Sequence, residues 1–310
     1  MKKTIFKEYN PIRTIYSLTS HKRIKTLSNK LGVVRRYFGW QIFSLMCNEE
    51  LIFKWIDSSK LKMKRSEAMI THNYYVGVYE YEEMSFLGRY LRETDRFIDI
   101  GANSGVYSVY CGAVLGLKGL AYEPIPSTFQ RLKENIALNN VTSLVTLINA
   151  GLGAKKETLL FTSLMDATNH VVDTKEIVQE TVAVEVLILD DEVKRTGLMP
   201  TFIKLDVEGF EKYVLDGASE ILKNRDLNVI LIELNDSGLR YGIKDIEIYN
   251  LLLSYGFKAY DYHVDEERLE ELNTKSLRLN TLFIRDIELV KERVKSANEI
   301  HMCQLDNYTI

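Results

Sequence analysis

Apolar and polar positions form repeating blocks from residue 96 onward, with short apolar runs followed by longer amphipathic segments. The short runs predict strands at 96–100, 119–124, 143–153, 201–209, 227–235, 258–263 and 281–285. The amphipathic segments predict helices at 104–116, 126–140, 210–223 and 245–255. Strands that alternate with helices of this length are typical of βαβ units, so we predict an α/β fold with a doubly wound parallel sheet.

Two parts of the chain depart from this rhythm. Residues 154–192 alternate apolar and polar positions between turn residues, which predicts a β hairpin inserted between the third and fourth strand units. Residues 1–75 are predicted to form a mainly helical appendage to a main domain at 76–310. Within the appendage, the apolar residues 38–47 (FGWQIFSLMC) are too few to span a bilayer. We expect a helix face packed on the main domain, with a position in a membrane interface as the alternative.

Basic residues are concentrated near the N-terminus. The 310-residue chain has a net charge of −3, yet residues 1–65 carry 15 Lys and Arg against 4 Asp and Glu. Such a segment suits a membrane surface, an anionic glycan or an acidic partner; the alternative is that it docks onto the acidic remainder of the same chain. We predict no nucleic-acid partner.

The cysteines and the first residues bear on the compartment. Cys47, Cys111 and Cys303 are far apart and odd in number, which suits a reducing compartment and indicates neither a disulfide framework nor a metal site. The basic start is not followed by the apolar region of a secretory signal. We therefore expect a cytoplasmic protein, peripheral at the inner membrane face where its basic segment meets lipid.

The loop after the first predicted strand, in the sequence DIGANSG, is suited to a ligand. Gly101 and Gly105 permit positive φ angles and leave the backbone open to close approach. In an open α/β sheet, ligands bind beyond the carboxyl ends of the strands, where this loop lies. Glu123 ends the next predicted strand, 22 residues after Gly101, where an acid accepts hydrogen bonds from ribose hydroxyls. We therefore predict a nucleoside ligand.

The same loop favours one nucleoside cofactor over another. It lacks the G-x-G-x-x-G pattern of dinucleotide sites, because Asn103 replaces the second glycine and the third is absent. Asp99 would repel a phosphate but attract an ammonium or sulfonium group. These features favour S-adenosylmethionine over NAD.

Four motifs together, FIDIGANSGVYS, AYEPIPSTFQRLKENIALN, FIKLDVEGFEKYVLDGA and VILIELN, closely resemble the FkbM family of S-adenosylmethionine-dependent methyltransferases. The resemblance covers roughly 75–285. It implies the seven-stranded, Rossmann-like sheet of class I methyltransferases, with its last strand, here 281–285, antiparallel. It also implies an O-methyltransferase acting on sugars of surface polysaccharides and glycolipids or on secondary metabolites.

The resemblance also assigns cofactor-binding residues. It places Asp99, Gly101, Asn103, Gly105 and Tyr107 at the methionine end of the cofactor, Glu123 at the ribose, and Asn149 and Ala150 beside the adenine. Glu80 would close over the cofactor; the alternative is an exposed helix carboxylate beside Glu82 and Glu83.

Methyl transfer to a hydroxyl needs an aligned acceptor and a general base. Strand alternation puts Lys204 and Asp206 on one face at the end of the fourth predicted strand, and Glu208 too if the strand continues that far. We predict Asp206 as the base or acceptor-orienting group and Glu208 as the second choice, with Lys204 offsetting their repulsion. Two alternatives remain: the carboxylate pair binds Mg²⁺, or Glu208 caps the following helix.

The acceptor is predicted to be a hydroxyl of a sugar or glycan. A lipid-linked sugar is one form that this acceptor could take. Residues 1–75 and the insert would overhang the crevice and set specificity, with Asn169 and either Tyr74 or Tyr75 contacting sugar. Glu233 and Asn235 end the fifth predicted strand and are candidates for binding acceptor hydroxyls, and His263 is a less favoured candidate base.

Two other functions compete with this prediction. An NAD-dependent sugar oxidoreductase or epimerase could use a similar sheet, although the main-sheet tyrosines lack a lysine four residues later. A non-catalytic scaffold in a glycan-assembly complex could keep the fold without turnover.

Overall fold

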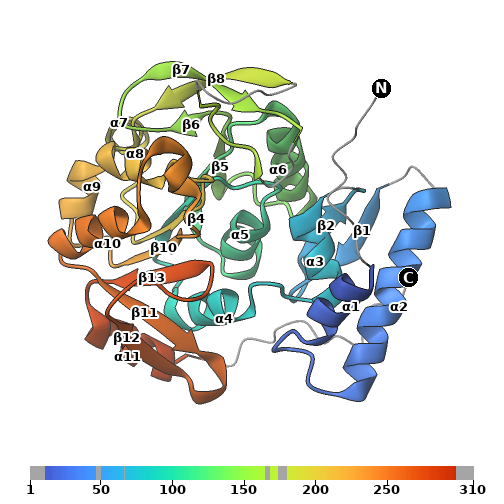
Figure 1. The fold of residues 1–310 in the computed structure, drawn as a ribbon. Helices are drawn as coiled ribbons and strands as arrows, with labels where there is room; N and C mark the ends of the chain where they lie inside the picture. The colour runs from blue at the N-terminus through green and yellow to red at the C-terminus, as the bar shows by residue number, and fades with distance from the viewer. Residues whose placement is uncertain (1–10, 47–49, 66, 165–167, 174–179, 298–310) are drawn as a thin grey trace.

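The computed structural model describes residues 11–46, 50–65, 67–164, 168–173 and 180–297. Its centre is an eight-stranded sheet in the order β12-β11-β13-β10-β9-β3-β4-β5 (Figure 1). The strands are β3 (Arg96–Ile100), β4 (Lys118–Tyr122), β5 (Val145–Ile148), β9 (Phe202–Leu205), β10 (Val229–Glu233), β11 (Lys258–His263), β12 (Arg268–Leu272) and β13 (Asn280–Ile284). The pairs from β5 across to β10 are parallel, and β13 is antiparallel to both β10 and β11.

The predicted fold class is confirmed by this sheet. Strand order reverses between β3 and β9, so the sheet is wound in both directions from one switch point. The last predicted strand is the antiparallel β13. The sheet has one strand more than the predicted seven, because β12 pairs antiparallel with β11 at the edge.

Helices cover both faces of the sheet (Figure 1). Alternation along β3 sends Phe97 into one core and Ile98 and Ile100 into the other. The first core includes α4 (Tyr81–Tyr90), α5 (Val106–Val109), the following π-helix (Tyr110–Val114), α6 (Pro126–Leu138) and α11 (Ile287–Lys295). The second includes α7 (Leu189–Thr196), α8 (Glu211–Asp216), α9 (Ser219–Lys223) and α10 (Asp245–Ser254). Short 3₁₀ turns at Ser237–Tyr241 and Val264–Glu266 connect β10 to α10 and β11 to β12.

The segment between the third and fourth strand units forms a small separate sheet. Here β7 (Glu157–Thr162) pairs antiparallel with β8 (Thr181–Leu187), and β6 (Gly151–Leu152) runs parallel to β8. A hairpin is therefore present where one was predicted. The last residues of the predicted 154–192 segment instead begin α7 at Leu189.

The N-terminal segment consists of α1 (Pro11–Thr19), α2 (Leu27–Met46), the hairpin β1 (Leu51–Lys54) and β2 (Lys60–Met63), and α3 (Ala68–Val76). Its apolar side chains belong to the same core as one face of the main sheet. Trp55 Nε1 donates to the Gly77 carbonyl at 2.6 Å, and the Asn135 amide oxygen of α6 accepts from Lys62 N at 2.8 Å. This segment is thus joined to the main sheet by packing and by hydrogen bonds.

Candidate active site

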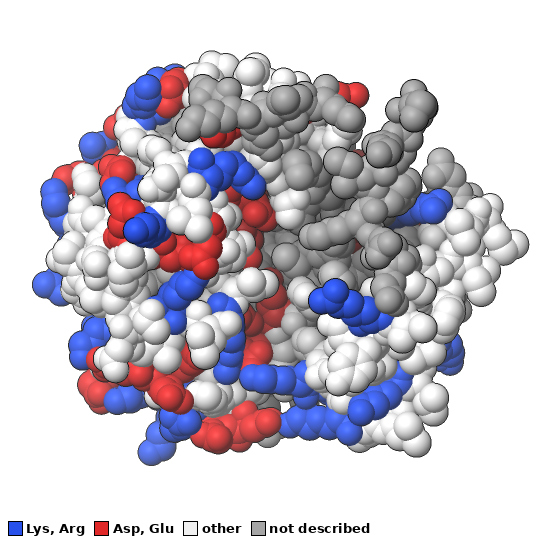
Figure 2. All heavy atoms as spheres, viewed as in Figure 1, with Lys and Arg blue, Asp and Glu red and all other residues white. Residues whose placement is uncertain are grey.

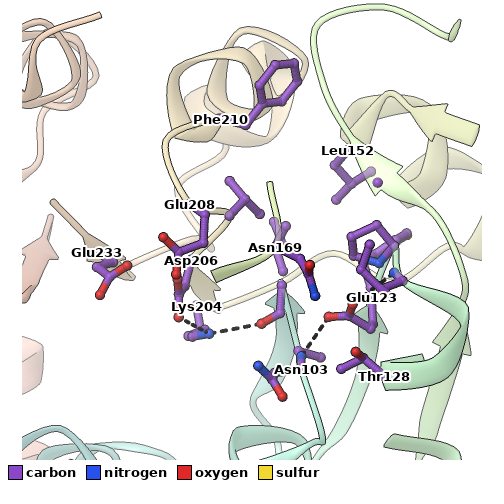
Figure 3. A pocket seen from close by; sticks show the side chains of 18 of the residues that line it. Asn103, Glu123, Thr128, Leu152, Asn169, Lys204, Asp206, Glu208, Phe210 and Glu233 are labelled. Atoms are coloured by element: carbon purple, nitrogen blue, oxygen red, sulfur yellow. Dashed lines mark hydrogen bonds and ion pairs between the residues drawn. The ribbon is translucent and has the colours of Figure 1, made fainter. Parts of the chain in front are cut away.

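A pocket opens at the carboxyl ends of β3, β4, β9 and β10, at the point where strand order reverses (Figure 3). Eight of the predicted site residues line it: Gly101, Asn103, Tyr107, Glu123, Ala150, Lys204, Asp206 and Glu208. The predicted residues Glu80, Asp99, Gly105 and Asn149 are not among its lining residues. In Figure 3, Glu233, Asp206, Glu208 and Lys204 lie on one side, and Glu123, Thr128 and Leu152 lie on the other.

The loop after β3 lies directly against the end of β9. Gly101 has φ +75°, and a Cβ there would lie 1.8 Å from the Asp206 carbonyl oxygen. The amides of Gly101 and Ala102 both donate to the Tyr122 carbonyl, at 3.0 and 2.9 Å. Only glycine fits the first position, because both the conformation and the space exclude a side chain. The close approach fixes the two sides of the pocket relative to each other.

Glu123 follows β4 and is held by backbone donors. One carboxylate oxygen accepts from Asn103 N at 2.9 Å, and the other accepts from Ile125 N at 2.9 Å. Burial raises the pKa of Glu123 to about 7, against the lowering effect of these two hydrogen bonds. A carboxylate oxygen has lone pairs for more than one donor, so this group can also accept hydrogen bonds from a ligand.

Three predicted cofactor residues support the pocket from behind. Asp99 is buried, accepts from the Ser108 hydroxyl at 2.6 Å and lies opposite Lys204 in the β3–β9 register. Asn149 Nδ2 donates to the Glu123 carbonyl at 2.8 Å and so shapes the loop after β4. Gly105 has φ +93° and faces Leu132, where a Cβ would approach a methyl group to 2.6 Å.

Lys204 supplies the positive charge of the site. Its ammonium donates to Asp206 Oδ2 at 3.0 Å and to the Gly101 carbonyl at 3.2 Å. Burial would lower the pKa of Lys204, but the carboxylates Asp206, Asp99 and Glu80 outweigh it and raise that pKa. Lys204 therefore stays protonated and keeps a negative partner at Asp206.

Two further carboxylates face Asp206. Oxygens of Asp206, Glu208 and Glu233 lie within 4.8 Å of one another. Burial raises the pKa of Glu208 to about 7, and the Asp206 carboxylate contributes. Burial and then the charges of Asp206 and Glu208 raise the pKa of Glu233 to about 10. Carboxylates this close share protons, so the cluster holds at least one at neutral pH.

The capping role considered for Glu208 is not seen, because the N-cap of α8 is Phe210 and no side chain caps this helix. Glu211 accepts from the backbone amides of Val207 and Gly209, both at 3.1 Å, at the start of α8. Glu208 has φ +54° and lines the pocket. Its carboxylate is therefore available to a ligand.

Glu80 and Tyr107 extend the polar network beneath the pocket. Glu80 precedes α4, and its Oε1 accepts from Asn280 Nδ2 at 2.7 Å, so it is not the exposed helix carboxylate of the alternative interpretation. Burial raises the pKa of both Glu80 and Tyr107. The nearby Glu80 raises the pKa of Tyr107 further, whereas Tyr107 lowers the pKa of Glu80. The Tyr107 ring also lies 5.3 Å from Lys204 Nζ.

The acceptor candidates divide into two groups. Asn169 and Glu233 line the pocket. Tyr74 and Tyr75 do not, because both are buried in the core beside α2, so their predicted sugar contact is wrong. His263 pairs with Glu270 at 2.9 Å on the β11–β12 hairpin, and the Asn235 side chain accepts from Ser237 N at 2.9 Å; neither lines the pocket.

Most of the apolar lining of the pocket, and Thr128, were not predicted from the sequence. Phe161 of β7, Phe210 after β9, Thr128 of α6 and Met69 of α3 all line the pocket. Phe210 stacks on Tyr213 with 4.4 Å between ring centres, which fixes its position. Its place directly after the acidic LDVEG motif was the available signal for Phe210.

The carboxylate cluster already has a cationic partner in Lys204. Three carboxylates form an oxygen donor set of the kind that Mg²⁺ prefers. Lys204, however, already places a buried positive charge 3.0 Å from Asp206, where a bound cation would be needed. This donor set fits a metal ion poorly, and we derive no step through one.

Comparison with known proteins confirms the family resemblance. The model of the methyltransferase FkbM domain matches residues 99–259, just over half of the chain. The chain is also similar to hexuronic acid methyltransferase AglP of Haloferax volcanii, with 30% identity over 146 residues. That match covers 46% of this chain and 57% of AglP, so the chain spans little more than half of this relative's length.

Solved structures with a similar chain course include two methyltransferases. The precorrin-6y C5,15-methyltransferase of Geobacter metallireducens aligns with 13% identity and a TM-score of 0.39, over 67% of this chain and 87% of its own. An S-adenosylmethionine-dependent methyltransferase of Agrobacterium tumefaciens aligns with 11% identity and a TM-score of 0.41, over 77% and 72% of the two chains.

Proposed function

Because the chain belongs to the FkbM methyltransferase family, we propose that it transfers a methyl group from S-adenosylmethionine to a hydroxyl of a sugar or glycan. The observation that carries this proposal is the division of one pocket into two sides. A backbone-held carboxylate, Glu123, faces a cluster of carboxylates around Lys204. The first suits a ribose, and the second suits a positively charged reacting group and the acceptor hydroxyl.

The residues present fit S-adenosylmethionine. Glu123 would accept from the ribose hydroxyls, and Ile125 and Leu152 would pack on the adenine. The bare backbone at Gly101 would let the methionine part approach the end of β9. When bound, the cofactor supplies a methyl group on an electrophilic sulfonium. Negative charge shared by Asp206 and Glu208 would favour that cation, whereas it would repel the pyrophosphate of NAD.

Asp206 is proposed as the general base. Its carboxylate pairs with the Lys204 ammonium at 3.0 Å and lines the pocket, so it can accept a hydrogen bond from the acceptor hydroxyl. As the acceptor oxygen is methylated, Asp206 would accept the hydroxyl proton. Glu208, whose pKa is about 7, lies close enough to take up that proton afterwards. Glu233, with its raised pKa, would donate a hydrogen bond and orient the acceptor.

The acceptor is proposed to be a sugar hydroxyl on two grounds. The relative AglP is named for a hexuronic acid. The pocket contains hydrogen-bonding groups suited to hydroxyls, Asn169 and Glu233, beside the aromatic rings of Phe161 and Phe210. Met69 and Asn169 come from the N-terminal segment and from the insert, so both segments are proposed to shape acceptor specificity.

The proposal is tested with the full chain and labelled S-adenosylmethionine. Free uronic acids, neutral hexoses and lipid-linked oligosaccharides serve as acceptors, and methylated products are identified by mass spectrometry. Calorimetry is expected to show binding of S-adenosylhomocysteine and none of NAD. Methyl transfer to at least one sugar hydroxyl is expected.

Two results would count against the proposal. Binding of NAD without binding of S-adenosylhomocysteine would favour the oxidoreductase interpretation. Binding of S-adenosylhomocysteine without transfer to any sugar of the panel would leave a nucleoside-binding protein and reject the acceptor class.

A further inference from the structure

Helix α2 is apolar on two opposite sides. Its inward side packs Val33, Tyr37 and Trp40 into the core shared with the main sheet. Its outward side carries Leu27, Leu31, Phe38, Ile42 and Leu45, spaced four, seven, four and three residues apart. This spacing places them on one face of a helix. Packing on the main domain was predicted for residues 38–47; within 38–46, the part that the structure describes, only one side of the helix packs in this way.

The outward side is exposed. The fractional exposures are 73% for Leu27, 62% for Leu31, 50% for Phe38, 57% for Ile42 and 69% for Leu45. A helix of 20 residues is about 30 Å long, so these side chains form one continuous stripe. Contiguous apolar patches of this kind on a protein surface mark sites of interaction with another protein or a membrane.

The charges around the stripe are of one sign. Residues 11–46 contain seven Lys and Arg and no Asp or Glu. Lys30 and Arg35 are exposed on α2 itself. In Figure 2, the described residues at the right edge, where α2 lies, are white with some blue, whereas red and blue are mixed at the left and bottom of the view. The surface thus combines apolar side chains with a positive rim.

We propose that the outward face of α2 binds an anionic membrane surface, with the helix lying in the plane of the interface. The apolar stripe would enter the boundary between headgroups and acyl chains, and Lys30 and Arg35 would pair with anionic headgroups. Attachment is peripheral, because none of the helices in the described residues is long and apolar enough to cross a bilayer.

The charge distribution separates a membrane from the other occupants. A second copy of the chain would bring an equally basic helix against this one, with no acid on either helix to offset the repulsion. A nucleic acid would require basic groups at the centre of the contact, but the centre of this face is apolar. An anionic bilayer complements both parts of the surface. It would also hold the protein where a lipid-linked glycan is found, although the inference does not depend on that acceptor.

The experiment is vesicle co-flotation of the full chain. Vesicles of phosphatidylcholine alone are compared with vesicles containing 30% phosphatidylglycerol. We expect at least tenfold stronger partitioning into the anionic vesicles, weakening as salt concentration rises. The variant Leu31→Ser/Phe38→Ser/Ile42→Ser should lose about a hundredfold in partitioning, because three apolar side chains no longer enter the interface.

Matched variants provide the controls. Leu160→Ser/Ile246→Ser/Leu277→Ser removes three other exposed apolar side chains and should bind vesicles as the wild type does. Lys30→Glu/Arg35→Glu should weaken anionic binding about tenfold, whereas Lys118→Glu/Arg225→Glu, with the same change of charge elsewhere, should not. Circular dichroism of every variant checks that it is folded.

Three outcomes would overturn the proposal. The first is no partitioning of the wild type into anionic vesicles. The second is equal partitioning of the wild type and the triple α2 variant. The third is a wild-type dimer that this variant converts to a monomer in sedimentation, since a second copy would then occupy the stripe. Each outcome is independent of methyl transfer, so it leaves the proposed function unaffected.

Discussion

Two glutamates at the ends of β4 and β10 face the same pocket from opposite sides (Figure 3) and differ in their surroundings. Each oxygen of Glu123 accepts a hydrogen bond from a backbone amide. Glu233 instead lies within 4.8 Å of oxygens of Asp206 and Glu208. Burial raises the pKa of Glu123 to about 7 and, with those neighbouring carboxylates, the pKa of Glu233 to about 10.

The difference shows how one pocket can combine binding with proton transfer. Backbone amides at fixed positions orient a carboxylate and stabilise its charged form, which suits the recognition of hydroxyl donors. Neighbouring carboxylates destabilise the charged form, so a proton is retained and can move between them. If this comparison is correct, changes on the Glu123 side should affect cofactor affinity, and changes on the Asp206 side should affect turnover.

The largest effect is expected from Asp206→Asn. The amide cannot accept the hydroxyl proton, so we expect kcat to fall by roughly 10²–10⁴-fold. Binding of S-adenosylhomocysteine, measured by calorimetry, should change less than about threefold, because the Glu123 side of the pocket is intact. Asp216→Asn, an exposed carboxylate of α8, is the control and should keep wild-type turnover. Equal losses in binding and turnover would contradict the separation of the two sides.

Gly101→Ala should disturb both sides at once. The new Cβ would lie 1.8 Å from the Asp206 carbonyl, and φ is +75°, so we expect a loss of about 2–5 kcal/mol in the free energy of unfolding. Gly116→Ala is the matched control, because its φ is +72° and nothing lies within 4 Å of the added carbon. It should cost only about 1–2 kcal/mol, from the backbone conformation. Denaturant unfolding measures both. Equal losses would mean that the contact between the loop and β9 contributes nothing.

Glu123→Gln should weaken cofactor binding with a smaller effect on turnover. The new amide NH₂ would face one of the two backbone donors, Asn103 N or Ile125 N, so that hydrogen bond would be lost. The ribose hydroxyls would also lose a charged acceptor. We expect S-adenosylhomocysteine to bind about 10- to 100-fold more weakly, with kcat at saturating cofactor within a few-fold of wild type. The variant should also lose the preference for adenosine over 2′,3′-dideoxyadenosine, since that preference depends on the ribose hydroxyls. A retained preference would assign the ribose to another residue.

The central sheet could be predicted because buried strands carry a clear signal. The continuous apolar run at 227–235 corresponds to β10, which is buried on both faces. The edge strand β12 has the sequence RLEEL and is largely exposed, so hydrophobicity gave no sign of it. The hairpin of β1 and β2 was missed for a different reason. Each strand has only four residues, which is too short for a clear alternation of apolar and polar positions.

The site was predictable where chain spacing determines position and unpredictable where packing does. Glu123 follows from the βαβ unit alone, and it lines the pocket with Gly101. The contact between Glu80 and Asn280 joins residues 200 positions apart, so no local pattern could reveal it. Glu208 was considered as the cap of α8, but α8 has no side-chain cap. Glu208 has a positive φ, and Glu211 accepts from the amides of Val207 and Gly209, which precede the helix.

The smallest effect, and the sharpest test of the two environments, is expected from Glu233→Gln. At pH 7 the glutamine resembles the protonated acid, so we expect little change in the free energy of unfolding and a kcat/KM within about threefold of wild type.

The pH dependence of stability should distinguish the two proteins. The pKa of Glu233 is raised from 4.5 to about 10, so the folded state retains a proton that the unfolded chain loses near pH 4.5. Its stabilising contribution is complete below pH 4.5 and is lost as pH rises toward 10. Glu123, Glu208 and Glu211 have pKa values of about 7, so they are largely titrated before a window of pH 8–9.5. The pKa of Glu83 is about 8, but Glu83 is present in both proteins, so the difference between their curves in this window reports Glu233. In that window the Tm should fall less steeply with pH in Glu233→Gln than in the wild type. Glu288→Gln changes an exposed glutamate, so it is the control and should follow the wild type. Parallel Tm curves for all three proteins would contradict the prediction, because they would mean that Glu233 is already ionised at neutral pH.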